Sequence, residues 1–109
     1  MSERKVREAV NFIRDFFVKR NISVNKLILF GSYARRNFSQ DSDVDIAIVS
    51  ENFTGKDIFQ RAEMLEGLQW ALVERFMMPF DIVPISLEEW EKSSSLIVGF
   101  VKEGQEIFN

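Results

Sequence analysis

Two residue types with common chemical roles are absent from the 109-residue sequence, which contains no cysteine and no histidine. Without cysteine, the chain has no disulfides, thiolate metal ligands or thiol nucleophiles. Without histidine, it has no Ser-His catalytic triad, no histidine-ligated zinc and no imidazole general base. Any chemistry must therefore depend on carboxylates, hydroxyls, lysine, arginine, backbone amides or a hard metal ion.

Long apolar runs and an excess of positive charge are also lacking. The apolar segments are too short to cross a membrane, and none of signal-peptide length follows the charged N-terminus, so we expect a cytoplasmic protein. The 14 Lys and Arg against 17 Asp and Glu give a formal charge of −3, which argues against a nucleic-acid binder held by phosphate contacts. Hydrophobic residues at 46% and charged residues at 28% are typical of a globular protein, and the length predicts one domain, residues 1–109.

Hydrophobic periodicity predicts an α/β (α+β) chain with a small mixed sheet flanked by helices. Apolar residues recur at three- and four-residue steps over residues 2–20, which indicates an amphipathic helix with Ser2 as its N-cap. Compact or alternating apolar segments predict strands over residues 27–30, 43–49 and 80–85. In the second strand, Val44, Ile46 and Ile48 would share one face, and Asp43, Asp45, Ala47 and Val49 the other.

The remaining apolar segments predict helices and one edge strand. We expect a long helix over residues 56–77, with a loop over residues 50–55 before it. Its buried stripe would consist of Ile58, Ala62, Leu65, Leu68, Leu72 and Phe76. Ser86 and Glu89 have the spacing of a capping box, so a short helix should begin there. A last helix is expected over residues 94–103, and residues 107–108 could add an edge strand.

Candidate chemistry lies in the segment from Gly31 to Asp45. Gly31-Ser32 directly follows a predicted strand, and Asp43-Val44-Asp45 begins the next one after ten further residues. Each half alone fits a turn or a solvated loop end, but both fall where a strand meets a loop, which is where ligand sites lie. Alternate residues of a strand lie about 6.5–7 Å apart on one face. Two such carboxylates can therefore straddle metal ions spaced ~3.5–4 Å, as in two-metal phosphoryl chemistry.

A third acid, Asp81, interrupts the otherwise apolar segment of residues 80–85. If that strand lies beside the second one, Asp81 converges with Asp43 and Asp45. Three carboxylates ~5 Å apart would repel by roughly 3 kcal/mol per pair at an effective dielectric constant of 20, so the cluster would need a cation. The alternative is that Asp81 is simply an exposed residue of an edge strand.

The combined pattern resembles the minimal nucleotidyltransferases of the DNA polymerase beta-like superfamily, which include the antitoxins of HEPN-domain toxins. The residues that match are Gly-Ser-x-Ala-Arg from Gly31 to Arg35, Asp-Ser-Asp-x-Asp-Ile from Asp41 to Ile46, and the later Asp81. The resemblance covers nearly the whole chain in element order. Family loops often have Gly after the arginine, whereas this chain has Arg36.

This resemblance implies the polymerase beta-like fold and a role for each matching residue. Gly31 and Ser32 would hold the phosphates of a nucleoside triphosphate, and Arg35 could contact them. Two Mg²⁺ ions would bind to Asp43, Asp45 and Asp81, which together form the catalytic set. Asp81 could also accept the proton of the acceptor hydroxyl, since there is no histidine to do so.

The implied function is transfer of AMP from ATP to a hydroxyl, with release of pyrophosphate. The acceptor would be a tyrosine of a partner HEPN-domain toxin, so that adenylylation makes this chain the antitoxin. Two alternatives stay open. The chain could neutralise a toxin by contact without catalysis, or it could modify a small molecule or an RNA end. Homo-oligomers are compatible with either.

Apolar residues also occur outside the predicted core stripe of the helix over residues 56–77. Phe59, Trp70 and Met77 lie about 100–120° from Ile58 around such a helix, in line with each other. A wide contact with the first helix would bury them, whereas a partner surface would leave them exposed. The cluster of Arg4, Lys5 and Arg7 is interpreted as a solvated helix face.

Overall fold

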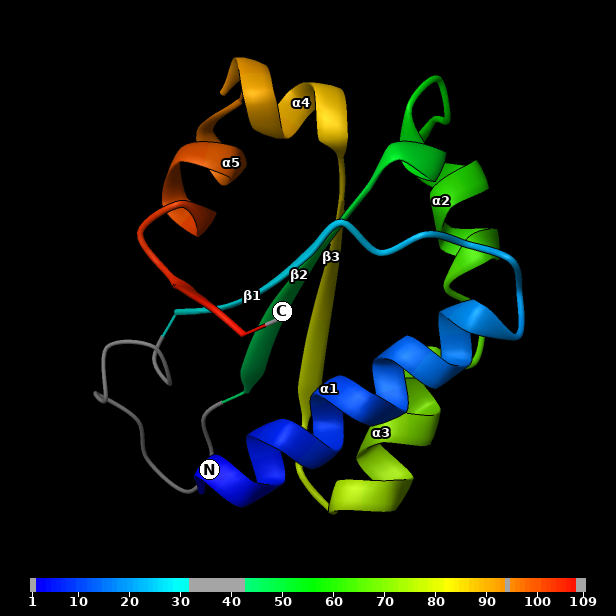
Figure 1. The fold of residues 1–109 in the computed structure, drawn as a ribbon, viewed down its shortest axis with the longest axis vertical. Coiled ribbons are helices and arrows are strands. Elements are labelled where there is room, and N and C mark those ends of the chain that lie inside the picture. The colour runs from blue at the N-terminus through cyan, green and yellow to red at the C-terminus, as the bar shows by residue number, and fades with distance from the viewer. Residues whose placement is uncertain (1, 32–42, 94, 108–109) are drawn as a thin grey trace.

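The predicted strands form one sheet in the computed structural model, which describes residues 2–31, 43–93 and 95–107. They are β1 (Lys26–Phe30), β2 (Val44–Ser50), β3 (Phe80–Ser86) and β4 (Gln105–Glu106). The order across the sheet is β3-β2-β1-β4, with β1 antiparallel to both β2 and β4, and β2 parallel to β3. Figure 1 shows β2 and β3 side by side through the middle of the molecule. The mixed sheet confirms the predicted fold class.

The helices cover the two faces of this sheet. They are α1 (Glu3–Val18), α2 (Ile58–Met64), α3 (Leu68–Phe76), α4 (Leu87–Lys92) and α5 (Leu96–Val101). Both predicted N-caps are confirmed, because Ser2 Oγ accepts a hydrogen bond from Lys5 N–H, and Ser86 and Glu89 form the capping box that begins α4. The segment after β2 was expected to be a loop, but it contains a 3₁₀ turn, η1 (Glu51–Phe53), capped by Ser50.

The prediction of one long helix over residues 56–77 is wrong, since two helices meet there at Gly67. Gly67 has φ of 87°, a left-handed conformation that glycine adopts without strain. The carbonyl groups left free at the break are satisfied from another element. Arg20 donates hydrogen bonds of 3.0 Å to Met64 O and 2.7 Å to Glu66 O.

The break at Gly67 also changes which side chains are buried. Leu68, Leu72 and Phe76 are buried as predicted, but Ile58 is 74% exposed and does not belong to the core. Of the two alternatives for Phe59, burial against the first helix is excluded, because its side chain is 76% exposed.

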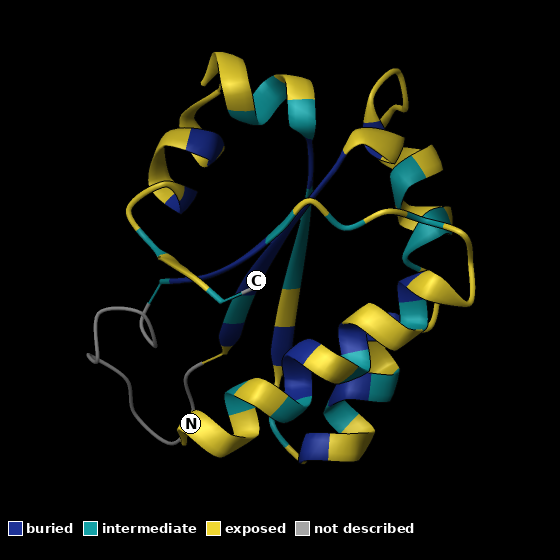
Figure 2. Cartoon of the chain, viewed as in Figure 1, coloured by how far each residue is buried: buried dark blue, intermediate teal, exposed yellow. Residues whose placement is uncertain are grey.

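Two apolar clusters hold the layers together, one on each face of the sheet (Figure 2). The side chains of β2 alternate between them as predicted: Val44, Ile46 and Ile48 pack in the cluster beneath α1 and α3, whereas Ala47 and Val49 pack in the cluster beneath α4 and α5. The larger cluster is Ala9, Val10, Ile13, Phe17, Leu27, Leu29, Val44, Ile46, Ile48, Phe53, Leu68, Leu72, Phe76 and Phe80. The smaller one is Ile28, Phe30, Ala47, Val49, Ile85, Val98 and Val101.

The end of the chain adds the short strand β4 to the outer edge of β1. The predicted edge strand over residues 107–108 lies two residues earlier, at Gln105–Glu106. Ile107 still donates a 2.8 Å hydrogen bond to Leu27 O, while Phe108 lies outside the described residues. Gly104 precedes this strand, and a Cβ there would come within 2.5 Å of Leu29 O, so only glycine allows this close approach.

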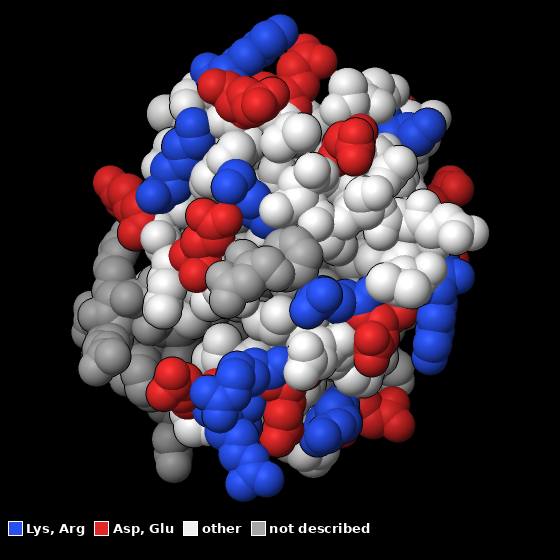
Figure 3. Space-filling view, in the orientation of Figure 1, with Lys and Arg blue, Asp and Glu red and all other residues white. Residues whose placement is uncertain are grey.

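The surface of α1 has charges of both signs, as Figure 3 shows. Arg4 pairs with Glu8 at 3.6 Å and Arg7 with Glu3 at 3.8 Å, which confirms the predicted solvated face. Among the helices that the structure describes, none is both long and apolar enough to span a bilayer.

Candidate active site

The three candidate acids lie at the end of the sheet where β2 and β3 begin. Asp45 and Asp81 are direct register partners in the parallel pair, and Asp43 precedes β2 by one residue. Register partners on neighbouring strands point to the same face, and so do alternate residues of one strand. All three acids therefore belong to the sheet face that α4 and α5 cover farther along. The prediction that the strand of Asp81 lies beside the second strand is confirmed.

The two side chains of the register pair differ in exposure. Asp45 is half-buried, because β2 is a central strand, whereas Asp81 is exposed on the edge strand β3. Asp81 is thus an exposed edge residue and, at the same time, the direct neighbour of Asp45. The two interpretations of its place in the fold are compatible.

Electrostatic repulsion is concentrated at Asp45. Burial raises the pKa of this carboxyl above its ordinary value, and the negative charges of Asp81 and Asp43 raise it further. Within residues 2–31, 43–93 and 95–107, no Lys or Arg forms an ion pair with any of the three acids. The described part of the site is therefore a place of uncompensated negative charge.

Gly31 lies directly against Asp45. Phe30, the last residue of β1, is the register partner of Asp45, and Gly31 follows it with φ of 71°. A Cβ on Gly31 would overlap Asp45 Oδ2 and lie 3.2 Å from Asp45 Cγ. The Asp45 carboxylate thus occupies the space that a side chain at residue 31 would need. The sequence pattern did not reveal this contact.

The donor chemistry of the site suits a hard cation such as Mg²⁺, which prefers carboxylate oxygens. In their present positions, however, no three acidic side chains of the described residues converge closely enough to hold one metal ion. Asp43 and Asp81 are exposed, so their side chains have room to rotate toward Asp45. The acids therefore suit a divalent ion, because carboxylates are the right type of ligand and they lie on the same face of the sheet. Their side chains must change rotamer to bind it.

Two predicted phosphate-binding residues, Ser32 and Arg35, lie outside the described residues, as does Arg36. The described part of the candidate site thus comprises Gly31, Asp43, Asp45 and Asp81, from three strands or their ends.

Comparison with known proteins identifies the family of the chain. A family model described as a nucleotidyltransferase domain matches residues 7–105. A Methanocaldococcus jannaschii protein named "putative protein adenylyltransferase" is 41% identical over 49 residues. That match covers 45% of this chain and 46% of the relative, so the chain spans less than half of that protein's length.

Solved structures share the fold. One is a toxin–antitoxin structure with AMP-PNP, which has a TM-score of 0.61 at 23% identity, over 91% of this chain and 72% of that one. A mutant of the toxin–antitoxin MntA–HpeT has a TM-score of 0.59 at 19% identity, with the same coverage of both chains. Because the family match spans nearly all of the sequence, this chain belongs to the nucleotidyltransferase domain family.

Proposed function

We propose that this nucleotidyltransferase moves AMP from ATP to a hydroxyl group of a protein, with Asp43, Asp45 and Asp81 as the acids of the reaction. The observation that carries the proposal is the register pairing of Asp45 with Asp81 beside Asp43, which gathers three carboxylates on one face without a neutralising partner among the described residues. The relative named as a protein adenylyltransferase supports the choice of nucleotide and of a protein acceptor.

The three carboxylates would hold Mg²⁺, which in phosphoryl transfer neutralises the phosphates and the departing pyrophosphate. Asp45, fixed between Gly31 and its two acidic neighbours, has the least freedom and would anchor the site. Asp81 is exposed, so one of its carboxylate oxygens can accept the proton of an incoming hydroxyl. The hydroxyl oxygen then bonds to the α-phosphorus of ATP, and the bond between that phosphorus and pyrophosphate breaks.

Gly31, Ser32 and Arg35 would hold the triphosphate on the other side of the acids. For Gly31 the structure supports this proposal, because the missing side chain lets its backbone lie directly against the Asp45 carboxylate and so beside the acids. The roles of Ser32 and Arg35 come from the sequence pattern.

The partner would be the toxin of a toxin–antitoxin pair, a HEPN-domain protein modified on tyrosine, and residues 1–109 would form a single nucleotidyltransferase domain. The structural likeness to toxin–antitoxin proteins supports this choice of partner.

The test is transfer of label from α-³²P-ATP to a co-expressed partner protein with and without Mg²⁺. We expect Asp45→Asn and Asp81→Asn each to lower the transfer rate at least a hundredfold, whereas Asp15→Asn on the exposed face of α1 serves as the matched control and leaves it unchanged. Equal labelling by the wild type and both active-site variants would refute the proposal. Neutralisation of a toxin by both variants, with intact complex formation, would instead favour an antitoxin that acts by contact.

A further inference from the structure

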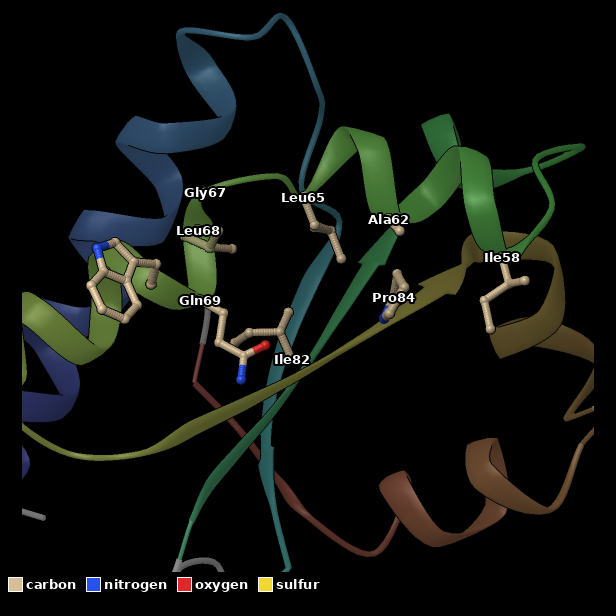
Figure 4. A pocket seen from close by; sticks show the side chains of 9 residues that line it. Ile58, Ala62, Leu65, Gly67, Leu68, Gln69, Ile82 and Pro84 are labelled. Atoms are coloured by element: carbon tan, nitrogen blue, oxygen red, sulfur yellow. The ribbon is translucent and has the colours of Figure 1, made fainter.

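An apolar groove runs along the outer edge of β3 toward Asp43. Its first part is a cavity of about 420 Å³ between β3 and the helices α2 and α3 (Figure 4). The lining residues there are Ile58, Ala62, Leu65, Gly67, Leu68, Gln69, Trp70, Ile82 and Pro84. The second part, of about 540 Å³, shares Gln69 and Trp70 with the first. It continues over Asp43, Val73, Glu74, Met77, Met78, Pro79 and Phe80. The two cavities are neighbours that share these two residues, and together they are called the groove; Asp43 of the candidate active site lines the second one.

The edge of β3 is protected against the addition of another strand. Gln69 Nε2 donates a 2.8 Å hydrogen bond to Phe80 O, and Arg61 Nη1 donates one of 3.4 Å to Pro84 O. Pro84 itself has no N–H to offer. With these backbone groups occupied or absent, the groove is suited to receiving side chains, not to pairing with a new strand.

The groove has large apolar side chains that water covers in the isolated chain. Ile58 is 74% exposed, Trp70 is 73% exposed and Met77 is 84% exposed. Tryptophan and methionine are enriched at protein interfaces, and tryptophan is frequent among the residues that dominate binding. Of the two alternatives left open for Trp70 and Met77, burial against the first helix is therefore excluded, and their exposure agrees with the partner-surface alternative.

Charge around the groove is negative. Asp43 and Glu74 line its second part, and no Lys or Arg is among the described residues that line either part. The nearest arginines on α2 and α3 are already paired, Arg61 with Glu89 at 2.6 Å and Arg75 with Glu8 at 3.5 Å. A second copy of this chain would bring the same acids together, whereas Lys and Arg on a partner would complement them.

We infer that this groove binds a segment of the acceptor protein that combines apolar side chains with Lys or Arg. The inference rests on the proposed function and names the place where the protein acceptor binds. Phe80 and Ile82 line the groove from the sheet face opposite to Asp45 and Asp81. Asp43 also lines it, so a segment lying in the groove would pass around the sheet edge near Asp43 to bring a hydroxyl to the acids. Trp70 and Met77 would contact its apolar side chains, and Glu74 its cations.

The test measures docking without nucleotide or transfer. Trp90→Phe leaves Trp70 as the single tryptophan, because the sequence has two. The probes are two synthetic 14-residue peptides with the same Leu, Val and Tyr positions, one with Lys and the other with Glu at the remaining positions. We expect the Lys peptide to shift the Trp70 emission to shorter wavelength, to bind at least tenfold more tightly than the Glu peptide, and to weaken in high salt.

Variants then locate the binding, measured by fluorescence anisotropy of labelled peptide. Trp70→Ala and Met77→Ala should each weaken the Lys peptide at least tenfold, and Glu74→Lys should reverse the preference between the two peptides. Leu96→Ala is the matched control, an apolar side chain that is 96% exposed on α5 and away from the groove, and it should change affinity less than twofold.

Absence of binding by either peptide, equal binding of both, or full affinity in Trp70→Ala would overturn the inference. Because Asp45→Asn blocks the proposed transfer but leaves the groove intact, it should retain peptide binding. If the wild type binds the Lys peptide but transfers no AMP, the proposed function fails and this inference stands. If it transfers AMP but does not bind the peptide, this inference fails and the proposed function stands.

Discussion

The strand pair β2–β3 has matching residues at both of its ends, and the two ends differ in how their polar groups are satisfied. At the far end, Ser50 and Ser86 are register partners and both are buried, yet each accepts a hydrogen bond from a helix that begins there. At the near end, Asp45 and Asp81 are register partners, and none of the described residues provides a counter-charge. The serine end stabilises the fold, whereas the acid end lowers its stability and provides reactive groups.

The serine end also has an ion pair that is extensively hydrogen-bonded, between Arg61 and Glu89. Glu89 Oε1 accepts hydrogen bonds of 2.9 Å from Ser86 N–H and 2.6 Å from Arg61 Nη1. Burial raises the pKa of Glu89, but the hydrogen bonds from Ser86 and Arg61 outweigh this effect, so the pKa lies below its ordinary value. The pKa of Asp45 is raised and the pKa of Glu89 is lowered, so the comparison between the acid end and the serine end can be tested by varying pH.

The largest effect on stability is expected for Gly31→Ala at the acid end. The new Cβ meets the Asp45 carboxylate, and φ of 71° is unfavourable for alanine, so we expect a loss of ~2–4 kcal/mol in the free energy of unfolding. The measurement is urea denaturation in wild-type and Asp45→Ala backgrounds. In the Asp45→Ala background the overlap with the carboxylate is absent. Only the cost of the left-handed backbone for alanine, roughly 1–2 kcal/mol, should then remain. Equal costs in both backgrounds would show that Asp45 does not occupy the space beside Gly31.

At the serine end, Glu89→Ala should lower the free energy of unfolding by about 1–3 kcal/mol. The substitution leaves the Ser86 N–H and the half-buried guanidinium of Arg61 without their shared acceptor. Glu88→Ala is the matched control, since its exposed pair with Lys92 should contribute less than about 0.5 kcal/mol. Indistinguishable stabilities of the two variants would mean that the serine end is not the stabilising one.

A smaller effect of opposite sign is expected for Asp45→Asn. This change removes one of the repelling charges and keeps the shape, so stability at pH 7 should rise by about 0.5 kcal/mol, a value limited by solvent screening. The same variant loses transfer activity under the proposed function. Denaturant titration without Mg²⁺ measures the gain, and a loss of stability instead would show that the carboxylate is satisfied in the native state.

The smallest effects are the pH dependences, which should run in opposite directions at the two ends. The pKa of Asp45 is raised in the fold, so its contribution to stability is fully present below 3.8 and is lost as pH rises through the folded value. The pKa of Glu89 is lowered, so its contribution is present above 4.5 and is lost as pH falls through the folded value. Denaturation of Asp45→Asn and Glu89→Ala beside wild type from pH 3 to 7 measures both, and parallel pH profiles would contradict the comparison.

Local patterns in the sequence predicted the strands and the caps, because alternation and capping spacing are properties of neighbouring residues. The faces of β2 and the cap at Ser86 were predicted in this way. The proximity of Asp81 to the second strand is a non-local pairing, which the sequence offered only as a condition and the structure supplies. The helix over residues 56–77 was predicted wrongly because periodicity continues through Gly67, while the break depends on a left-handed backbone that Arg20 supports from a distant helix. Ile58 was misplaced for the same reason.

In the candidate site, too, local features could be predicted from the sequence and non-local contacts could not. Its acids could be found from spacing and from one charged residue in an apolar strand. The contact of Gly31 with Asp45 could not, because it depends on the antiparallel pairing that places Phe30 opposite Asp45. The groove beside Asp43 likewise depends on how α3 packs against β3 and is not visible in the sequence.

The parallel pairing of β2 with β3 has a consequence for the kinetics of folding. The chain must pass through α2 and α3 before β3 can lie beside β2, so Asp45 and Asp81 meet only when this long connection has formed. Non-local pairings of this kind form late relative to local contacts. The repulsion between the acids would then be absent from the transition state, and removing it should slow unfolding without changing the folding rate. With that order of events, the acid pair would shorten the lifetime of the native state and leave the speed of its formation unchanged.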